Sequence, residues 1–133
     1  MKLTAKSEYA LLALVHLGRC RGPEPVSVET IARAQGIPPK FLEQLMLALK
    51  RARLVTSVKG QRGGFRLARQ PKAISLAEVV RLFDGALAPV ESASTHFYEP
   101  TPVEREKKLL RVFREVRNLV AHKLEHTTIA DVA

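Results

Sequence analysis

The stretch VSVETIARAQGIPPKFLEQLMLALKRARLVTSVKGQRGGFRLAR, residues 26–69, contains two short helical patterns followed by two short β-branched runs. Ser27 is a typical N-cap for the first helix, and Gly36 supplies the left-handed residue that a tight turn needs. Pro39 suits the first position of a second helix, which the apolar spacing extends over residues 39–52. Two short helices joined through a glycine turn predict a helix-turn-helix.

The second half of the stretch predicts a β-hairpin over residues 54–69. Residues 65–69 can pair with residues 54–58 across a connection that holds three glycines and two cations. This connection lacks a Walker lysine, and a strand rather than a helix follows it, so it does not suit a nucleotide phosphate. An ordinary turn is one alternative, but a basic tip directly after a helix-turn-helix favours the wing of a winged helix. The expected DNA contacts of this wing are Lys59, Gly60, Arg62, Gly63 and Arg66.

The positive charge of the chain is concentrated in its first part. The formal net charge is +9, and residues 1–77 contain 14 Lys and Arg but only four acids. No acid occurs between Gln44 and Ala77, where eight cations fall. A merely solvated face is the alternative, but such faces usually mix both signs. The distribution therefore predicts a polyanion partner, double-stranded DNA, for this part of the chain.

The exposed positions of the second helix carry side chains that suit the edges of DNA bases. Gln44 can pair with adenine, Glu43 can accept from cytosine, and a lysine can reach guanine or phosphate. For Glu43, an ion pair with a neighbouring lysine on the helix surface is an equal alternative. The expected reading residues are Lys40, Glu43, Gln44, Lys50 and Arg51.

Two further helices flank the winged region. Thr4 can cap a helix that runs to about Arg19, with an apolar side formed by Tyr9, Leu12, Ala13 and residues 15–17. Ser75 and Glu78 have the spacing of a capping box and open a helix that ends near Gly85. The helical pattern then fails until about residue 100.

A long helix is predicted near the end of the chain. Thr101 and Glu104 form a second capping-box pattern, and about 24 residues without Gly or Pro follow, which would span roughly 35 Å. Thr128 and Asp131 are spaced to begin a last short turn. The apolar stripe of the long helix is broader than one small core can cover, which favours a dimer contact. The residues expected in this contact are Leu109, Phe113, Val116, Val120 and Leu124.

Several classes of protein are disfavoured by the sequence. No apolar run approaches the roughly 18 residues of a membrane span and no secretory signal is recognisable, so a cytoplasmic location without membrane contact is expected. A single cysteine, Cys20, excludes an internal disulfide. HKLEH, residues 122–126, matches an inverzincin pattern, but a third ligand and a cleft are missing. An enzyme is not expected.

In combination, these motifs resemble the bacterial regulators typified by IscR, NsrR and CymR (the Rrf-two type). The resemblance rests on MKLTAKSEYALLALVHL at the start, the winged stretch, ISLAEVVRLFDG behind it and TTIADVA at the end. It implies a mainly α fold with a small β-hairpin: a winged helix-turn-helix over residues 1–85, a sensor segment over 86–101, and a dimerisation helix and tail over 102–133. It also implies a homodimer that binds a palindromic operator, usually as a repressor.

The sensor segment departs from the family pattern. Many members hold an iron–sulfur cluster through three cysteines in this segment, whereas ALAPVESASTHFYEPT contains none. We therefore predict no cluster, because one distant cysteine cannot replace the missing thiolates. The candidate sensing residues are Cys20, Glu8 and His96, and the candidate effectors are a regulatory protein or a small molecule. A second hypothesis is a protein-interaction module that regulates an enzyme, with DNA binding secondary.

Overall fold

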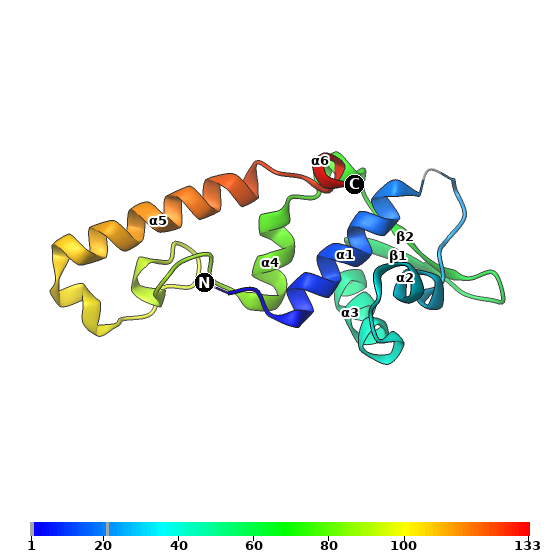
Figure 1. The fold of residues 1–133 in the computed structure, drawn as a ribbon, viewed down its shortest axis with the longest axis horizontal. Helices are drawn as coiled ribbons and strands as arrows, with labels where there is room; N and C mark the ends of the chain where they lie inside the picture. Colours follow the sequence, from blue (N-terminus) through cyan, green and yellow to red (C-terminus); the bar gives the residue numbers. More distant parts are fainter. Residues whose placement is uncertain (1, 21) are drawn as a thin grey trace.

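The helix-turn-helix and its wing lie at one end of an elongated molecule, and the long helix α5 extends away from them (Figure 1). The computed structural model describes residues 2–20 and 22–133. No helix in this part of the chain is both long and apolar enough to cross a membrane. The elements are α1 Ala5–Arg19, α2 Val28–Gln35, α3 Pro39–Arg51, β1 Val55–Val58, β2 Gly64–Leu67, η1 Pro71–Ala73, α4 Leu76–Asp84, η2 Glu91–Ala93, η3 Pro102–Arg105, α5 Lys107–Glu125 and α6 Ile129–Val132.

The first three helices begin and end where local signals predict. The side chain of Thr4 caps α1, and the side chain of Ser27 caps α2 by accepting from a backbone N–H two or three residues into each helix. Gly36 ends α2 in the left-handed conformation, with φ of 67°, and Pro39 is the first residue of α3. The predicted fold class, a mainly helical winged helix-turn-helix with a small hairpin, is confirmed.

The core surrounds α1, which contacts α2, α3, α4 and α6. The fully buried face of α1 includes Leu14, which was not among the residues predicted for the apolar side of this helix. Tyr9 and Leu12, which were predicted there, are only partly buried. The reason is that a central helix is covered from several directions, so a single-stripe pattern underestimates its buried surface. The largest buried side chains around it are Ile31, Leu42, Met46, Leu49, Leu54, Ile74 and Ile129.

The wing is a two-stranded antiparallel hairpin in which Val55 pairs with Leu67 and Val58 pairs with Gly64. A short third segment joins it, because Val26 and Phe65 exchange two backbone hydrogen bonds of 2.8 Å. This bridge ties β2, near the loop end of the hairpin, to the residues just before α2. The two backbones approach so closely at Gly64 that a Cβ atom there would lie 2.3 Å from the carbonyl oxygen of Val26.

We expect Gly64→Ala to lower the free energy of unfolding by about 2–4 kcal/mol, because the backbone of the bridge must shift to admit a methyl group. Gly60→Ala is the matched control in the same hairpin: its φ is 111°, but nothing lies within 4 Å of its would-be Cβ. Its cost should be only that of the strained backbone, about 1 kcal/mol. Urea denaturation followed by far-UV circular dichroism measures the free energy of unfolding of both variants. Equal destabilisation by the two substitutions would contradict the close backbone contact at Gly64 as the cause.

Both ends of α4 are held by long-range polar contacts. Ser75 caps the helix as predicted, but the carboxylate of Glu78 binds Arg69 at 2.7 and 2.9 Å instead of completing a capping box. At the other end, Asp84 accepts from the hydroxyl and the backbone N–H of Thr4. Burial alone would raise the pKa of Asp84, but the Thr4 hydrogen bonds outweigh burial and hold this pKa below its ordinary value.

The long helix begins later than predicted. A 3₁₀ turn, η3, precedes it, and no side chain caps either segment, so the predicted capping box at Thr101 and Glu104 was wrong. The Thr101 hydroxyl instead contacts that of Ser92 at 2.5 Å, in the preceding loop. As a result, α5 has 19 residues and a length of about 28 Å rather than 35 Å.

The C-terminal tail returns to the winged region (Figure 1). Thr128 and Asp131 form the predicted capping box of α6, and Thr128 also bridges to Ser75 before α4. Ile129 is fully buried in the same core as α1. The tail therefore packs on the N-terminal part of the fold, although it follows α5 in sequence.

Candidate nucleic-acid interface

The outer face of α3 is the polar surface that the spacing predicted. Leu42, Leu45, Met46 and Leu49 are buried and fix the helix against the core. Tyr9 packs edge-on against Phe41 with ring centroids 5.6 Å apart, which further fixes the rotation of α3. The exposed side chains of the opposite face are Lys40, Glu43, Gln44, Leu47, Lys50 and Arg51.

Glu43 makes no salt bridge with Lys40 or Lys50. Within residues 2–20 and 22–133, the only salt bridges join Arg69 to Glu78 and Arg81 to Glu125. The ion pair between Glu43 and a neighbouring lysine, the alternative to a base contact, is therefore not formed. Its carboxylate is available to accept a hydrogen bond from a partner, while its role as a base contact stays a prediction.

Leu47 is an additional exposed residue on this face that the sequence reasoning missed. Its side chain is 47% exposed, although leucine is usually buried. At 100° per residue it lies within about 60° of both Glu43 and Gln44 on the helix surface. An apolar side chain at this place suits the C5-methyl group of thymine, the one apolar feature of the major groove. The helical spacing could have revealed it, but only polar residues had been considered.

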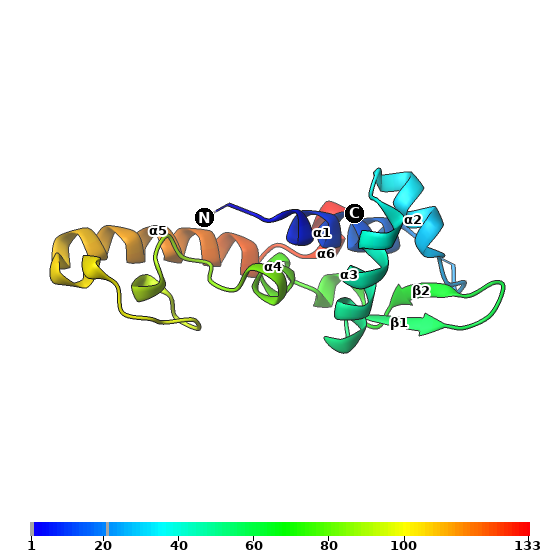
Figure 2. The same cartoon turned by 90° about the horizontal axis from the view of Figure 1, so that it is seen from below.

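The tip of the wing extends beyond the body of the molecule, on the side of α3 (Figure 2). Lys59, Gly60 and Arg62 are exposed at this tip. Two other predicted wing contacts, Gly63 and Arg66, also have structural tasks, and their contact with DNA stays a prediction. A Cβ at Gly63 would lie 2.2 Å from the carbonyl oxygen of Val58, so the turn itself requires glycine there.

Arg66 is the second of these residues. Its guanidinium donates a hydrogen bond of 2.7 Å to the carbonyl oxygen of Pro23, in the connection between α1 and α2. The side chain is exposed, but this contact directs it toward the protein's own backbone. Sequence spacing could not show this contact, because Pro23 and Arg66 are 43 positions apart.

Arg53, immediately after α3, has an uncommon backbone conformation. Its φ is 61°, the one positive φ of a residue other than glycine in the described chain. Its N–H bonds to the carbonyl of Lys50, and the N–H of Leu54 bonds to that of Leu49, which closes the helix in the manner of a glycine C-cap. For an L-residue this conformation costs about 1–2 kcal/mol. Arg53 was not among the predicted DNA contacts.

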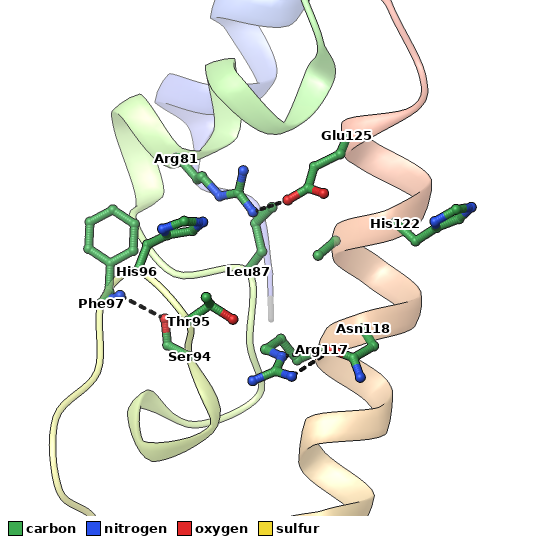
Figure 3. Close-up of a pocket in the computed structure, with 11 residues that line it drawn as sticks. Arg81, Leu87, Ser94, Thr95, His96, Phe97, Arg117, Asn118, His122 and Glu125 are labelled. Carbon is green, nitrogen blue, oxygen red and sulfur yellow. Dashed lines mark hydrogen bonds and ion pairs between the residues drawn. The ribbon is translucent and has the colours of Figure 1, made fainter.

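The sensor segment packs against α5 and encloses a cavity of about 220 Å³ with it (Figure 3). Arg117 fixes the segment by donating to the carbonyl oxygen of Ala93 at 2.8 Å. Across the cavity, Arg81 of α4 donates to Glu125 of α5 at 2.5 Å, and this hydrogen bond lowers the pKa of Glu125. His96 lies beside this pair (Figure 3), and His122 of α5 also lines the cavity.

The three candidate sensing residues are not brought together. Glu8 and Cys20 lie near opposite ends of α1, about 18 Å apart along its axis, and His96 is in the loop beside α5. Cys20, the C-cap of α1, is exposed. Its Sγ lies 3.3 Å from the carbonyl oxygen of His16, to which the thiol donates.

The donor set of the sensor segment does not fit an iron–sulfur cluster. Its buried polar side chains are Ser92 and Ser94, whose oxygens are engaged with Thr101 and with the N–H of Phe97. Clusters are held by cysteine thiolates, and the one cysteine of the chain lies in the other part of the fold. Nor do any three His, Cys, Asp or Glu side chains among the described residues gather to bind a metal ion.

The residues of the HKLEH motif take part in two separate contacts within the protein. The rings of His122 and His126 stack with centroids 4.2 Å apart, and a ring nitrogen of His126 lies 2.8 Å from the His122 carbonyl oxygen. Glu125 is the partner of Arg81. The histidines of the motif therefore contact each other at the C-terminal end of α5, and its glutamate joins α5 to α4.

Comparisons with known proteins agree with this geometry. A family model, Rrf2, described as an iron-dependent transcriptional regulator, matches residues 3–133. The HTH-type transcriptional regulator CymR of Bacillus subtilis is 32% identical over 133 residues, covering 100% of this chain and 90% of that protein. The solved structure of CymR, the global cysteine regulator of B. subtilis, superposes with a TM-score of 0.79 at 30% identity, covering 100% and 96% of the two chains. For the structure of T. potens IscR the TM-score is 0.75 at 30% identity, with 98% and 85% covered.

Proposed function

The chain belongs to the Rrf2 family of transcriptional regulators, and we propose that it is a homodimeric repressor that binds a palindromic operator through α3 and the wing. One observation carries the proposal. Helix α3 and the hairpin of the wing lie together at one end of the molecule (Figure 2), and no acid occurs between Gln44 and Ala77. A surface of this charge and shape suits the major groove and the adjacent phosphates.

The exposed apolar face of α5 supports a dimer. Leu119 is 73% exposed and Val112 is 50% exposed, and Leu109 and Val116 continue the same face. Two of the residues first expected in this contact, Val120 and Leu124, instead pack inward against Ala77, Val80 and Leu87, and Phe113 is half-buried. We therefore assign the dimer contact to Leu109, Val112, Val116 and Leu119. An uncovered apolar face on a charged protein is unfavourable unless a partner covers it.

A symmetric dimer explains the expected form of the operator. A two-fold axis between two α5 helices relates the two α3 helices, so both read the same half-site sequence in opposite directions. Half-sites one helical turn apart, or a multiple of it, would be about 34 Å or a multiple of it from centre to centre. Binding to such a site, in the cytoplasm where the chromosome is, would block transcription.

Regulation by the sensor segment is also part of the proposal. Residues 86–101 contact α5, and the cavity beside them reaches the Arg81–Glu125 pair that joins α4 to α5. A small molecule or a regulatory protein at this place would act on the connection between the winged domain, residues 1–85, and the dimerisation unit, residues 102–133. The donor chemistry supports an effector other than an iron–sulfur cluster.

The salt dependence of DNA binding tests the proposal. An operator selected from genomic fragments should be bound with an affinity that falls along a log–log slope of about 0.9 per phosphate contacted, so that eight contacts would lose about 10⁴-fold between 50 and 200 mM salt. Fluorescence anisotropy with the selected fragment and a scrambled one measures both slopes. If the protein retained no DNA fragment at moderate salt, the result would favour the second hypothesis, a protein-interaction module that regulates an enzyme.

A further inference from the structure

A hollow of about 670 Å³ lies between the last turn of α3 and strand β1. Three cationic side chains border it: Lys50 from α3, Arg53 from the turn and Lys59 from the tip of the wing. Thr56 and Ser57 of β1 add two hydroxyl groups. Val55 and Ala68 complete the lining, and no carboxylate among the described residues lies in it, so the polar groups of this hollow suit an anion.

The position of the hollow relates it to DNA. It connects the exposed face of α3 with the wing, the two elements that are proposed to contact the duplex. When a helix lies in the major groove, sugar-phosphate strands pass along both edges of that groove, within reach of side chains beside the helix. The hollow therefore lies where a phosphodiester would pass.

The presence of arginine at position 53, in a left-handed conformation, is not explained by the closing of α3. A glycine would close α3 at this position without backbone strain, whereas Arg53 holds a φ of 61°. Its guanidinium makes no hydrogen bond or salt bridge within the described chain, and it is exposed. Compensation of the helix dipole does not explain it, because Lys50 and Arg51 already place two cations in the last turn of α3.

We propose that this hollow is a phosphate site of the DNA interface, in which Arg53 binds a backbone phosphodiester together with Lys50 and Lys59. The C-terminal end of α3 is the negative end of its dipole, so an anion there needs several cations, and the hollow has three. A guanidinium is suited to this task because its fork of donors matches two phosphate oxygens. The strained backbone directs this side chain to the site, and the inference rests on the proposed DNA binding.

The test is a variant that should be more stable but bind more weakly. Arg53→Gly removes both the strain and the charge, so its thermal midpoint should rise by about 2–6 °C. Its affinity for the operator and for scrambled DNA should fall by about 10-fold at about 100 mM salt. Because a dimer carries two such sites, the magnitude of the salt slope should fall by about 1.8.

Two control variants distinguish a phosphate contact of Arg53 from the effect of lowering the net positive charge of the protein. Arg53→Lys keeps a cation at the site but not the guanidinium fork, so it should keep the wild-type salt slope while losing less affinity than Arg53→Gly. Arg114→Ala removes one exposed cation per subunit on α5, at the other end of the molecule and about 140° around the helix axis from Leu119, and should leave the salt slope unchanged. An Arg53→Gly variant with wild-type affinity and slope would overturn the phosphate site but leave the DNA-binding function intact. A wild-type protein that binds no DNA would overturn both.

Discussion

Leu119→Glu will convert the dimer into monomers and lower the affinity for a full palindromic operator by about 100-fold or more, because the two half-sites are then no longer bound as one unit. Leu119, at 73%, is the most exposed residue of the free apolar face of α5, and glutamate keeps a good helix propensity there. In a symmetric contact both copies would bury this carboxylate without a partner, which costs several kcal/mol.

Sedimentation velocity over a range of concentrations measures the loss of the dimer, and anisotropy with full and half operators measures the loss of affinity. Arg111→Glu is the matched control: it places the same residue on α5, eight positions earlier and about 80° around the axis. This variant should remain dimeric. A Leu119→Glu protein that stays dimeric would show that another surface joins the subunits.

Gln44→Ala should reduce affinity for the operator by about 5- to 150-fold per half-site, the value of one good bidentate contact with a base, while scrambled DNA is bound as before. Its side chain is exposed on the outer face of α3, and its removal leaves the buried face of the helix unchanged. Glu43→Ala should relax the preference at one base pair, because its carboxylate makes no salt bridge among the described residues.

Arg62→Ala provides the contrasting result. Arg62 is exposed at the wing tip, where a phosphate contact is independent of sequence. This variant should weaken operator and scrambled DNA by the same factor and reduce the salt slope of the dimer by about 1.8. Parallel titrations of all three variants on both DNAs make the comparison. If Gln44→Ala and Arg62→Ala lost equal affinity on every sequence, the assignment of base reading to α3 would be wrong.

The parts of the fold that could be predicted are those whose signals lie within one turn of chain. Thr4, Ser27 and Ser75 cap helices through backbone groups two or three residues away, and Gly36 requires only its own φ. The reading face of α3 follows from helical periodicity in the same way. Leu47 was equally visible to that periodicity but was passed over because it is apolar.

The parts that could not be predicted depend on competition between distant partners. Thr101 had the sequence pattern of a cap, but its hydroxyl contacts Ser92, and α5 consequently begins at Lys107. Glu78 had the pattern of a capping box, but the guanidinium of Arg69 is a stronger partner for its carboxylate than a backbone N–H. Likewise, Arg66 is directed to Pro23 because strand β2 lies beside the connection between α1 and α2.

The sequence by itself determined the helix-turn-helix, the basic wing and the family, because local hydrogen bonds, side-chain period and charge are all readable along the chain. Only the tertiary structure decided which residues of α5 remain free for a partner, since packing of Val120 and Leu124 on α4 leaves Leu119 and its neighbours uncovered. It alone also revealed the left-handed Arg53. Packing chooses among partners that are far apart in sequence, and a backbone conformation that costs energy is kept only when the surrounding fold requires it.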